Sequence, residues 1–477
     1  MDSKIFIGRQ KELSELDRLL NKKSSSLVVI RGRRRVGKSR LVQAFGKGHR
    51  FLHFAGLPPQ KNTTMQTELE AFSQQFSLNH LPAIKADDWT NLFAFLARDT
   101  AKGRVIILFD EISWMGSGDP DFLGKLKNAW DMQFSQNPKL ILILCGSIST
   151  WIEKNILSST GFMGRISLDL IVGELSLRDC NAMLNALGSK ANAYEKFKIL
   201  SVTGGIPRYL EEIQPNLSAD ENIKRLCFNQ NGILFREFGD IFHDLFTTKS
   251  VYYQKIVELL EGEALAFNDI CQRLQVKKSG FWSDYLDELI KAGFLKRDFT
   301  WDLKTGKASR LSRFRLSDNY LRFYLKYIGP NKDKIESGLF ESKAMSSLPG
   351  WEAIMGLQFE NLVLNSYRFI WEKLNLNTND IISHGAYFQR QTTRYPGCQI
   401  DYMIKTRYNT LIACEIKFSR NEIKSDVLDA VQKKQDAILL PTGYAFWPVL
   451  IHVNGVSESV IEAGYFTHII DLSELLD

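Results

Sequence analysis

Gly32-Arg33-Arg34-Arg35-Val36-Gly37-Lys38-Ser39 matches the pattern G-x-x-x-x-G-K-[ST]. The apolar run at residues 27–30 precedes it, and residues 40–45 after it have the composition of a helix. A strand, a glycine-containing loop and a helix in this order form a phosphate-binding loop. Its backbone N–H groups and the positive end of the helix dipole face the phosphates. The sequence therefore predicts a nucleotide-binding α/β fold built on a buried parallel sheet.

The residues of this loop have distinct expected roles. Lys38 is expected to reach the β- and γ-phosphates and to support catalysis there, and Ser39 is expected to hold Mg²⁺. The backbone around the phosphates completes the expected nucleotide-binding set, which includes Gly32, Val36, Gly37 and Arg40. ATP and Mg²⁺ are thus the expected ligands.

A second motif supports the first. Residues 104–109 are mostly apolar and run directly into Asp110 and Glu111, a Walker B pattern. A buried strand would deliver Asp110 to the nucleotide and to the Mg²⁺ shell, while Glu111 sits where a base polarises the attacking water. The alternative is a strand ending in a solvated acidic turn. Its position downstream of a phosphate-binding loop favours the catalytic interpretation.

Two further apolar runs complete the expected sheet. Residues 51–54 lie between the two motifs in the sequence, and residues 140–147 follow them. We expect residues 51–54 to form a strand inserted between the Walker A and Walker B strands, which, together with a glutamate beside the Walker B aspartate, is typical of the hydrolytic (ASCE) branch of P-loop ATPases. Ser147, at the end of the last run, is expected either to sense the γ-phosphate or merely to cap its strand.

Two other stretches carry a family resemblance. Phe6-Ile7-Gly8-Arg9-Gln10-Lys11-Glu12-Leu13 resembles the opening of STAND and initiator-type AAA+ ATPases, and Thr203-Gly204-Gly205-Ile206-Pro207-Arg208 resembles the G-x-P element of their helical lid. The resemblance implies that Arg9 lies near the nucleotide and that Pro207 packs on the adenine. Arg165 follows the last strand, where either an arginine finger or a salt-bridged surface arginine is expected.

Throughout its length the chain is similar to the archaeal ATPase group, which has a STAND-like ATPase, a winged helix and a C-terminal domain. With 477 residues, of which 44% are hydrophobic and 24% charged, several packed domains are expected. We expect four segments: a P-loop ATPase domain at residues 1–175, a helical lid at 176–245, a winged helix-turn-helix at 246–330 and a restriction-endonuclease-like α/β domain at 345–477.

The composition indicates in which cellular compartment the protein is expected. The six cysteines show neither C-x-x-C pairing nor metal-ligand spacing, and the N-terminus does not look like a signal peptide. No apolar run approaches the length of a membrane span. We therefore expect a soluble cytoplasmic protein with reduced thiols and no membrane partner. Whether identical chains assemble into an oligomer is left open.

The expected winged helix has a basic hairpin. Residues 291–315 contain eight Lys or Arg and two Asp, a net charge of +6, which indicates contact with DNA or another nucleic acid through its phosphates. The expected recognition helix, however, carries Asp284, Asp287 and Glu288, which oppose a phosphate-lined groove. We therefore expect the hairpin to contact the sugar-phosphate backbone of the nucleic acid rather than to read its bases. The alternative is a winged helix that serves only to pack against protein.

The C-terminal segment contains a possible second catalytic set. Residues 399–404 and 411–417 alternate as two strands around a turn near Asn409, which brings Asp401 close to Glu415 and places Lys417 on the face of Glu415. Two carboxylates can bind Mg²⁺ and a lysine can orient water. The set resembles the D…E-x-K core of PD-(D/E)xK nucleases, with Glu360 as a further metal ligand and Gln432 as a weaker candidate.

A non-catalytic interpretation stands beside this one. Residues 351–477 have 11 basic and 15 acidic side chains, a net charge of −4, which is unfavourable for DNA binding by this segment alone. A nuclease fold can be retained as an interaction module without activity. The sequence thus predicts an ATP-hydrolysing switch with a nucleic-acid-directed output. The alternative is a signalling or scaffold ATPase whose C-terminal domain cuts nothing.

Overall fold

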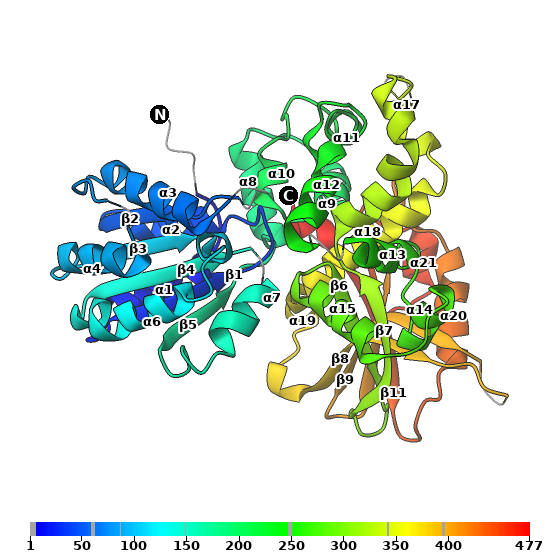
Figure 1. Ribbon diagram of the computed structural model, residues 1–477. Helices are drawn as coiled ribbons and strands as arrows, with labels where there is room; N and C mark the ends of the chain where they lie inside the picture. The colour runs from blue at the N-terminus through cyan, green and yellow to red at the C-terminus, as the bar shows by residue number, and fades with distance from the viewer. Residues whose placement is uncertain are drawn as a thin grey trace. The chain divides into compact units, whose positions relative to one another are not determined.

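The chain forms two compact units, Met1–Leu175 and Ser176–Asp477 (Figure 1). The computed structural model describes residues 6–58, 63–85, 87–147, 149–246, 250–340, 343–393 and 396–477. In this described part, no helix is both long and apolar enough to span a bilayer. Each unit has its own five-stranded sheet.

The first unit is built on a parallel sheet in the order β2-β3-β4-β1-β5. Its strands are almost entirely buried at the centre, as the apolar runs predict. They are β1 (Ser26–Arg31), β2 (Arg50–Ala55), β3 (Val105–Asp110), β4 (Leu140–Gly146) and β5 (Ile166–Ile171).

The arrangement of these strands corrects one aspect of the sequence interpretation. Residues 51–54 lie between the Walker motifs in the sequence, but strand β2 is at the sheet edge, beyond β3. The strand that lies between the Walker A strand β1 and the Walker B strand β3 in space is β4. Ser147, directly after β4, is therefore delivered between the two motifs.

Helices cover both faces of this sheet (Figure 1). One face is filled by aromatic rings, such as Phe72 of α3 stacked on Phe54 of β2 at 4.5 Å between centroids. The helices are α1 (Gln10–Leu20), α2 (Lys38–Gly46), α3 (Met65–Leu78), α4 (Trp89–Asp99), α5 (Ile112–Met115), α6 (Phe122–Met132) and α7 (Ser149–Ile152).

The second unit begins with a helical region, as predicted from residue 176 onward. Ser176 accepts a hydrogen bond from the backbone N–H of Asp179 and so caps the first helix. The helices are α8 (Leu177–Ala186), α9 (Ala193–Thr203), α10 (Pro207–Leu210), α11 (Ala219–Cys227) and α12 (Ile233–Phe246).

Three helices and a hairpin follow, in the order predicted for a winged helix-turn-helix. They are α13 (Ser250–Leu259), α14 (Phe267–Arg273), α15 (Gly280–Lys291), β6 (Leu295–Trp301) and β7 (Ala308–Leu316). The boundary after the expected winged helix is helical: Gly329–Asn331 forms a 3-10 turn that leads into α17 (Lys332–Glu336). The preceding helix is α16 (Asn319–Phe323).

The second sheet has the order β12-β11-β10-β9-β8. Strands β8, β9 and β10 are antiparallel neighbours, whereas β10, β11 and β12 run parallel, with α20 as the crossover between β10 and β11. The elements are α18 (Trp351–Asn365), α19 (Tyr367–Lys373), β8 (Ile381–Gln389), β9 (Cys398–Thr406), β10 (Thr410–Ile416), α20 (Asp426–Ala437), β11 (Ala445–His452), α21 (Glu458–Glu462) and β12 (His468–Asp471).

The β6–β7 hairpin packs on the edge of this second sheet. Trp301 of β6 contacts Tyr387 of β8 at 5.5 Å between ring centroids, and the Ser383 hydroxyl donates to the backbone carbonyl of Gly306 at 2.6 Å. Gly306 lies at the hairpin turn with φ 74°. The hairpin and the C-terminal sheet therefore form a continuous surface.

Candidate functional site

The loop between β1 and α2 has the backbone that phosphate binding requires. Gly37 has φ 89°, a left-handed conformation that favours glycine, and it leads directly into α2. At Gly32, φ is 151° and a Cβ atom would lie 2.1 Å from the carbonyl oxygen of Val172. Both glycines are thus required by geometry. The loop directs Lys38 and Ser39 from the first turn of α2.

Lys38 is buried against this loop. Its ammonium donates hydrogen bonds to the backbone carbonyls of Gly32 at 3.0 Å and Arg33 at 3.1 Å. The side chain is therefore held inside the curve of the loop, and its predicted contact with the β- and γ-phosphates stays a prediction. Arg40, also predicted to contribute to nucleotide binding, is half-buried one residue beyond Ser39 in α2.

Ser39 and Asp110 lie together at the end of β3. The Ser39 hydroxyl donates to Asp110 Oδ2 at 2.6 Å. Burial alone would raise the pKa of Asp110, but its interactions with His53, Ser39 and Cys145 outweigh burial and lower the pKa, so the carboxylate is anionic. A hydroxyl and an anionic carboxylate suit Mg²⁺, which takes the rest of its shell from water and phosphate. The residues therefore fit the expected ion.

The sequence interpretation missed His53. This residue lies on β2, and its Nε2 atom is 3.5 Å from Asp110 Oδ2. The sequence offered one indication of a role for His53, because it is a polar residue within the otherwise apolar run at residues 51–54. The missing information was that β2 pairs directly with β3, a relation that only the strand order supplies.

Glu111 and Ser147 contact each other across the ends of β3 and β4. The Ser147 hydroxyl donates to Glu111 Oε2 at 2.9 Å, and the Ser147 backbone N–H donates to the same oxygen at 3.2 Å. Glu111 has φ 50° and ψ 53°, a left-handed conformation that is uncommon for a residue with a side chain. Ser147 therefore contacts the expected base, a partner that neither sequence-based alternative named.

Arg9 braces the phosphate-binding loop. Its guanidinium donates to the carbonyl of Val36 at 3.0 Å and to the carbonyl of Gly173 at 2.6 Å, and it pairs with Glu12 at 3.1 Å. The side chain is 6% exposed. The structure thus places Arg9 behind the loop that holds the phosphates, and its donors bind backbone carbonyls.

The remaining predicted residues of the ATPase part have these positions. Arg165 forms a bidentate ion pair with Asp131, at 2.7 Å for Nε and 2.9 Å for Nη2, which is the salt-bridged alternative. Pro207 is the first residue of α10 in the second unit, and its fixed φ suits a helix start. Its predicted contact with the adenine stays a prediction.

The C-terminal sheet brings Asp401 and Glu415 together. The β9–β10 register pairs Met403 with Ala413 and Tyr402 with Cys414, so the next pair in the ladder is Asp401 opposite Glu415. The backbone N–H of Ile416 donates to Asp401 Oδ2 at 3.0 Å. This is the proximity that the alternating pattern predicted.

Two lysines meet these carboxylates. Lys417 Nζ lies 2.8 Å from Glu415 Oε1, as expected for residues on one face. Lys434 of α20 lies 2.6 Å from Glu415 Oε2 and 3.5 Å from Asp401 Oδ1. Lys434 was not predicted, although it lies three residues after the buried Val431 on the inward face of its helix. Gln432, the weaker candidate, is exposed and donates to Asp436 instead.

The carboxylates titrate differently. Burial and the neighbouring Glu415 raise the pKa of Asp401. Burial also acts to raise the pKa of Glu415, but the charges of Lys434 and Lys417 outweigh it and lower the pKa. Burial, followed by the charge of Asp401, raises the pKa of Glu360 to about 7.

The predicted three-carboxylate metal site is not formed. Among the described residues, no group of three or more His, Cys, Asp or Glu side chains is arranged to hold a metal ion, so Glu360 does not join Asp401 and Glu415 as a ligand. Glu360 lies on α18, and it interacts electrostatically with Arg315 and Arg322 as well as with Asp401. Two carboxylates remain, a number that Mg²⁺ sites accept when water and phosphate complete the shell.

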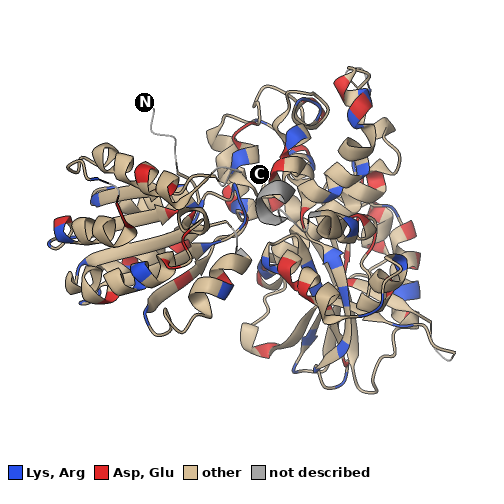
Figure 2. Cartoon of the chain, in the orientation of Figure 1, with Lys and Arg blue, Asp and Glu red and all other residues tan. Residues whose placement is uncertain are grey.

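Lys and Arg residues occur along the β6–β7 hairpin, where the cartoon is coloured blue (Figure 2), and several of them make contacts within the second unit. Arg313 donates to Gln399 at 3.1 Å and lies over the Phe388 ring at 4.6 Å. Arg315 pairs with Asp298 at 2.6 Å and also donates to Asn361. Arg310, Lys304 and Lys307 are exposed. The contacts of Arg313 and Arg315 therefore agree with a hairpin that packs against protein.

The first unit has the defining features of a P-loop ATPase domain. Its parallel sheet has the phosphate-binding loop after β1 and the Asp110–Glu111 pair at the end of β3, next to β4. Residues 6–213 match a family described as an ATPase domain predominantly from Archaea. The chain thus carries an archaeal-type ATPase domain.

Similar proteins include one of uncharacterized function from Methanocaldococcus jannaschii, which is 25% identical over 394 residues, 81% of this chain and 82% of that protein. Among solved structures, the Walker-type ATPase of Pyrococcus abyssi has a TM-score of 0.49 at 16% identity, covering 67% of this chain and 96% of that one. The Aeropyrum pernix ORC2 protein has a TM-score of 0.46 at 14% identity, covering 71% and 97%.

Proposed function

We propose that this protein is an ATP-hydrolysing switch whose second unit acts on nucleic acid. The observation that carries the ATPase part is the cluster of Ser39, Asp110 and Glu111 beside the phosphate-binding loop. Ser39 and Asp110 would hold Mg²⁺, which would neutralise phosphate charge, and Glu111 would polarise the attacking water. Lys38 would stabilise the charge on the phosphates, and Pro207 would support the adenine from the lid.

Kinetics of two variants test the ATPase part. Lys38→Ala should lose nucleotide binding, because the phosphates lose their fixed cation. Glu111→Gln should retain binding of ADP and lower kcat by about a hundredfold or more, because its amide cannot act as a base. Wild-type turnover by Glu111→Gln would remove Glu111 from the proposal.

For the second unit, we propose phosphodiester cleavage at Asp401, Glu415 and Lys417. The proposal is supported by the meeting of both carboxylates and Lys417 on one face of the sheet. Asp401 and Glu415 would hold a divalent ion, and Lys417 would orient water or stabilise the transition state. The exposed cations of the β6–β7 hairpin, such as Arg310, would add contacts to the phosphate backbone.

One contact favours a second candidate function. Lys434 bridges Asp401 and Glu415 with its own positive charge, which would also suit an interaction module that has no need of a metal ion. A cleavage assay separates the two functions. Single- and double-stranded DNA and RNA are incubated with the protein and Mg²⁺ or Mn²⁺, with and without ATP.

Matched variants identify the source of any cleavage. Asp401→Ala and Glu415→Ala should each abolish cleavage, whereas Glu422→Ala, which removes an exposed carboxylate from the same region, should leave it unchanged. Cleavage that persists in both site variants would come from elsewhere, and the interaction module would then be the better description of the domain.

A further inference from the structure

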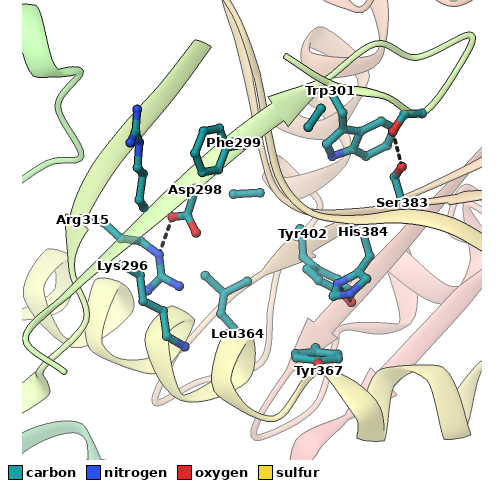
Figure 3. Close-up of a pocket in the computed structure, with 15 residues that line it drawn as sticks. Lys296, Asp298, Phe299, Trp301, Arg315, Leu364, Tyr367, Ser383, His384 and Tyr402 are labelled. Atoms are coloured by element: carbon teal, nitrogen blue, oxygen red, sulfur yellow. Dashed lines mark hydrogen bonds and ion pairs between the residues drawn. The ribbon is translucent and has the colours of Figure 1, made fainter. Parts of the chain in front are cut away.

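A cavity of about 420 Å³ lies within the second unit (Figure 3). The β6–β7 hairpin, strands β8 and β9, and the end of α18 with the start of α19 form its walls. Ligand pockets commonly measure about 300–1,000 Å³, so this cavity is large enough for a small molecule or for one unit of a polymer.

One end of the cavity is aromatic. The His384 ring lies 4.8 Å from the ring of Tyr367 and 5.9 Å from that of Tyr402. The Tyr402 hydroxyl is fixed by Trp371, which donates to it at 2.9 Å, and it lies 3.2 Å from His384 Nδ1. Burial lowers the pKa of His384, so this ring is uncharged at neutral pH. These contacts hold the rings in place before any ligand arrives.

The other end of the cavity is basic, as Figure 3 shows. Lys296 and Arg297 are exposed on β6, and the Arg297 guanidinium lies 4.7 Å from the centroid of the Phe299 ring. Asp298 is paired with Arg315 at 2.6 Å, which offsets its negative charge. Phe299 is 44% exposed and offers a further aromatic surface on the hairpin.

We propose that this cavity binds one nucleotide unit, with the base against His384 and Tyr367 and the phosphate at Lys296 and Arg297. Base stacking on aromatic rings together with a cationic path for the backbone is the combination that binds single-stranded nucleic acid. A purely apolar ligand would not match the basic end of the cavity, and a simple anion would not match its aromatic end. The proposal rests on the proposed function, because it names how the second unit holds its strand.

The cavity and the carboxylates of the proposed cleavage site lie on opposite faces of β9. Tyr402 follows Asp401 on β9, so the two side chains leave opposite faces of the strand. Arg315, in the cavity wall, interacts electrostatically with Glu360, which in turn interacts with Asp401. The cavity and the carboxylates are thus connected through Arg315 and Glu360.

Fluorescence anisotropy of a labelled oligothymidylate with the full chain tests the proposal. Excess ADP fills the phosphate-binding loop, and divalent cations are withheld so that the strand is not cut. His384→Ala should weaken binding about tenfold, because one stacking surface is lost. Lys296→Ala should reduce the slope of log affinity against log salt concentration by about 0.7, the loss of one phosphate contact.

Two phenylalanines of equal exposure provide a matched comparison. Phe299→Ala should weaken binding, whereas Phe281→Ala, at 45% exposure on α15 outside the cavity, should not. Equal losses from both, or binding unaffected by His384→Ala and Phe299→Ala, would overturn the cavity proposal. If the cavity proposal failed in this way while the wild-type protein still cut nucleic acid, the proposed nuclease function would stand without the cavity.

A free nucleotide would offer the same base and phosphate, and competition distinguishes the two sources. Thymidine monophosphate lacks the β-phosphate that the phosphate-binding loop holds. If it binds the wild type but not His384→Ala while the oligonucleotide does not bind, the cavity takes free nucleotides and the nucleic-acid function fails. If neither ligand binds the wild type, the cavity proposal is wrong.

Discussion

The Ser147 hydroxyl donates a hydrogen bond of 2.9 Å to the carboxylate of Glu111, joining the end of β4 to the residue after β3. The same carboxylate oxygen also accepts from the Ser147 backbone N–H. Because β4 lies between the strands of the two Walker motifs, Ser147 is placed to orient the proposed base. Glu111 is itself held in a left-handed backbone conformation.

Replacing Ser147 therefore tests a positioning role. Ser147→Ala removes the hydroxyl but keeps the backbone N–H bond, so Glu111 should be less well oriented. A hydrogen bond to a charged group contributes about 1.5–3 kcal/mol, so we expect kcat for ATP to fall about tenfold or more, with little change in KM. Ser147→Thr retains the hydroxyl and should recover most of the activity. An unchanged kcat in the alanine variant would exclude the role.

Arg9 provides a second prediction, for stability and nucleotide affinity together. Arg9→Ala leaves the buried carbonyl of Val36 and the carbonyl of Gly173 without their charged donor, which should lower the free energy of unfolding by about 2 kcal/mol or more. It should also weaken ADP binding, since Val36 belongs to the phosphate-binding loop. Denaturation and ADP titration measure the two effects.

Arg18 on α1, the helix that Arg9 precedes, is the matched control. Its side chain is 70% exposed and pairs with Glu15 at the surface, so Arg18→Ala should change stability by less than about 1 kcal/mol. If Arg9→Ala is as mild as Arg18→Ala, then Arg9 does not brace the loop.

The two sites differ in how much the sequence could predict. The Gly32–Ser39 motif has a fixed geometry, so it predicted the loop, its strand and its helix; alternation along residues 399–417 placed Asp401 opposite Glu415. His53 and Lys434 were missed because each reaches its site from a separate element. His53 needs the β2–β3 pairing and Lys434 needs the packing of α20. Such relations depend on tertiary structure.

The winged-helix prediction illustrates the same limit. The segment expected at residues 246–330 contains α13, α14, α15 and the β6–β7 hairpin. Net charge alone could not distinguish arginines that face solvent from arginines that contact protein. Arg313 lies over Phe388 of the C-terminal sheet, a neighbour that is distant in sequence.

Glu68 predicts a pH dependence of the first unit. The side chain is 2% exposed, and Oε2 accepts from the Leu57 N–H at 3.2 Å. Burial raises its pKa from 4.5 to about 7. Between these values the folded protein keeps a proton that the unfolded chain has released, so stability falls as the pH rises through this window.

Glu68→Gln should remove that dependence, because the amide is neutral at every pH and can still accept from Leu57. The variant should be more stable than the wild type near pH 7, by on the order of 1–3 kcal/mol, with the difference shrinking toward pH 4.5. Urea denaturation over a pH series measures it. Glu70→Gln, an exposed position on the same helix, should show no such trend; a parallel trend in both variants would refute the assignment.

Lys434 allows the proposed metal site to be tested without any nuclease assay. Its ammonium lies 2.6 Å from Glu415 and 3.5 Å from Asp401, so Lys434→Met leaves two neighbouring carboxylates without their shared cation. We expect a loss of about 2 kcal/mol or more at neutral pH, because the pair is partly buried. Acid should lessen the loss as Asp401, whose pKa is already raised, becomes protonated. Mg²⁺ should restore the stability of Lys434→Met, because the ion replaces the missing positive charge. Lys433→Met, which changes an exposed residue of α20, is the control. Its stability should stay within about 0.5 kcal/mol of the wild type with or without Mg²⁺. If Mg²⁺ fails to stabilise Lys434→Met, then Asp401 and Glu415 do not form a metal site, and the interaction-module function becomes the better account of this domain.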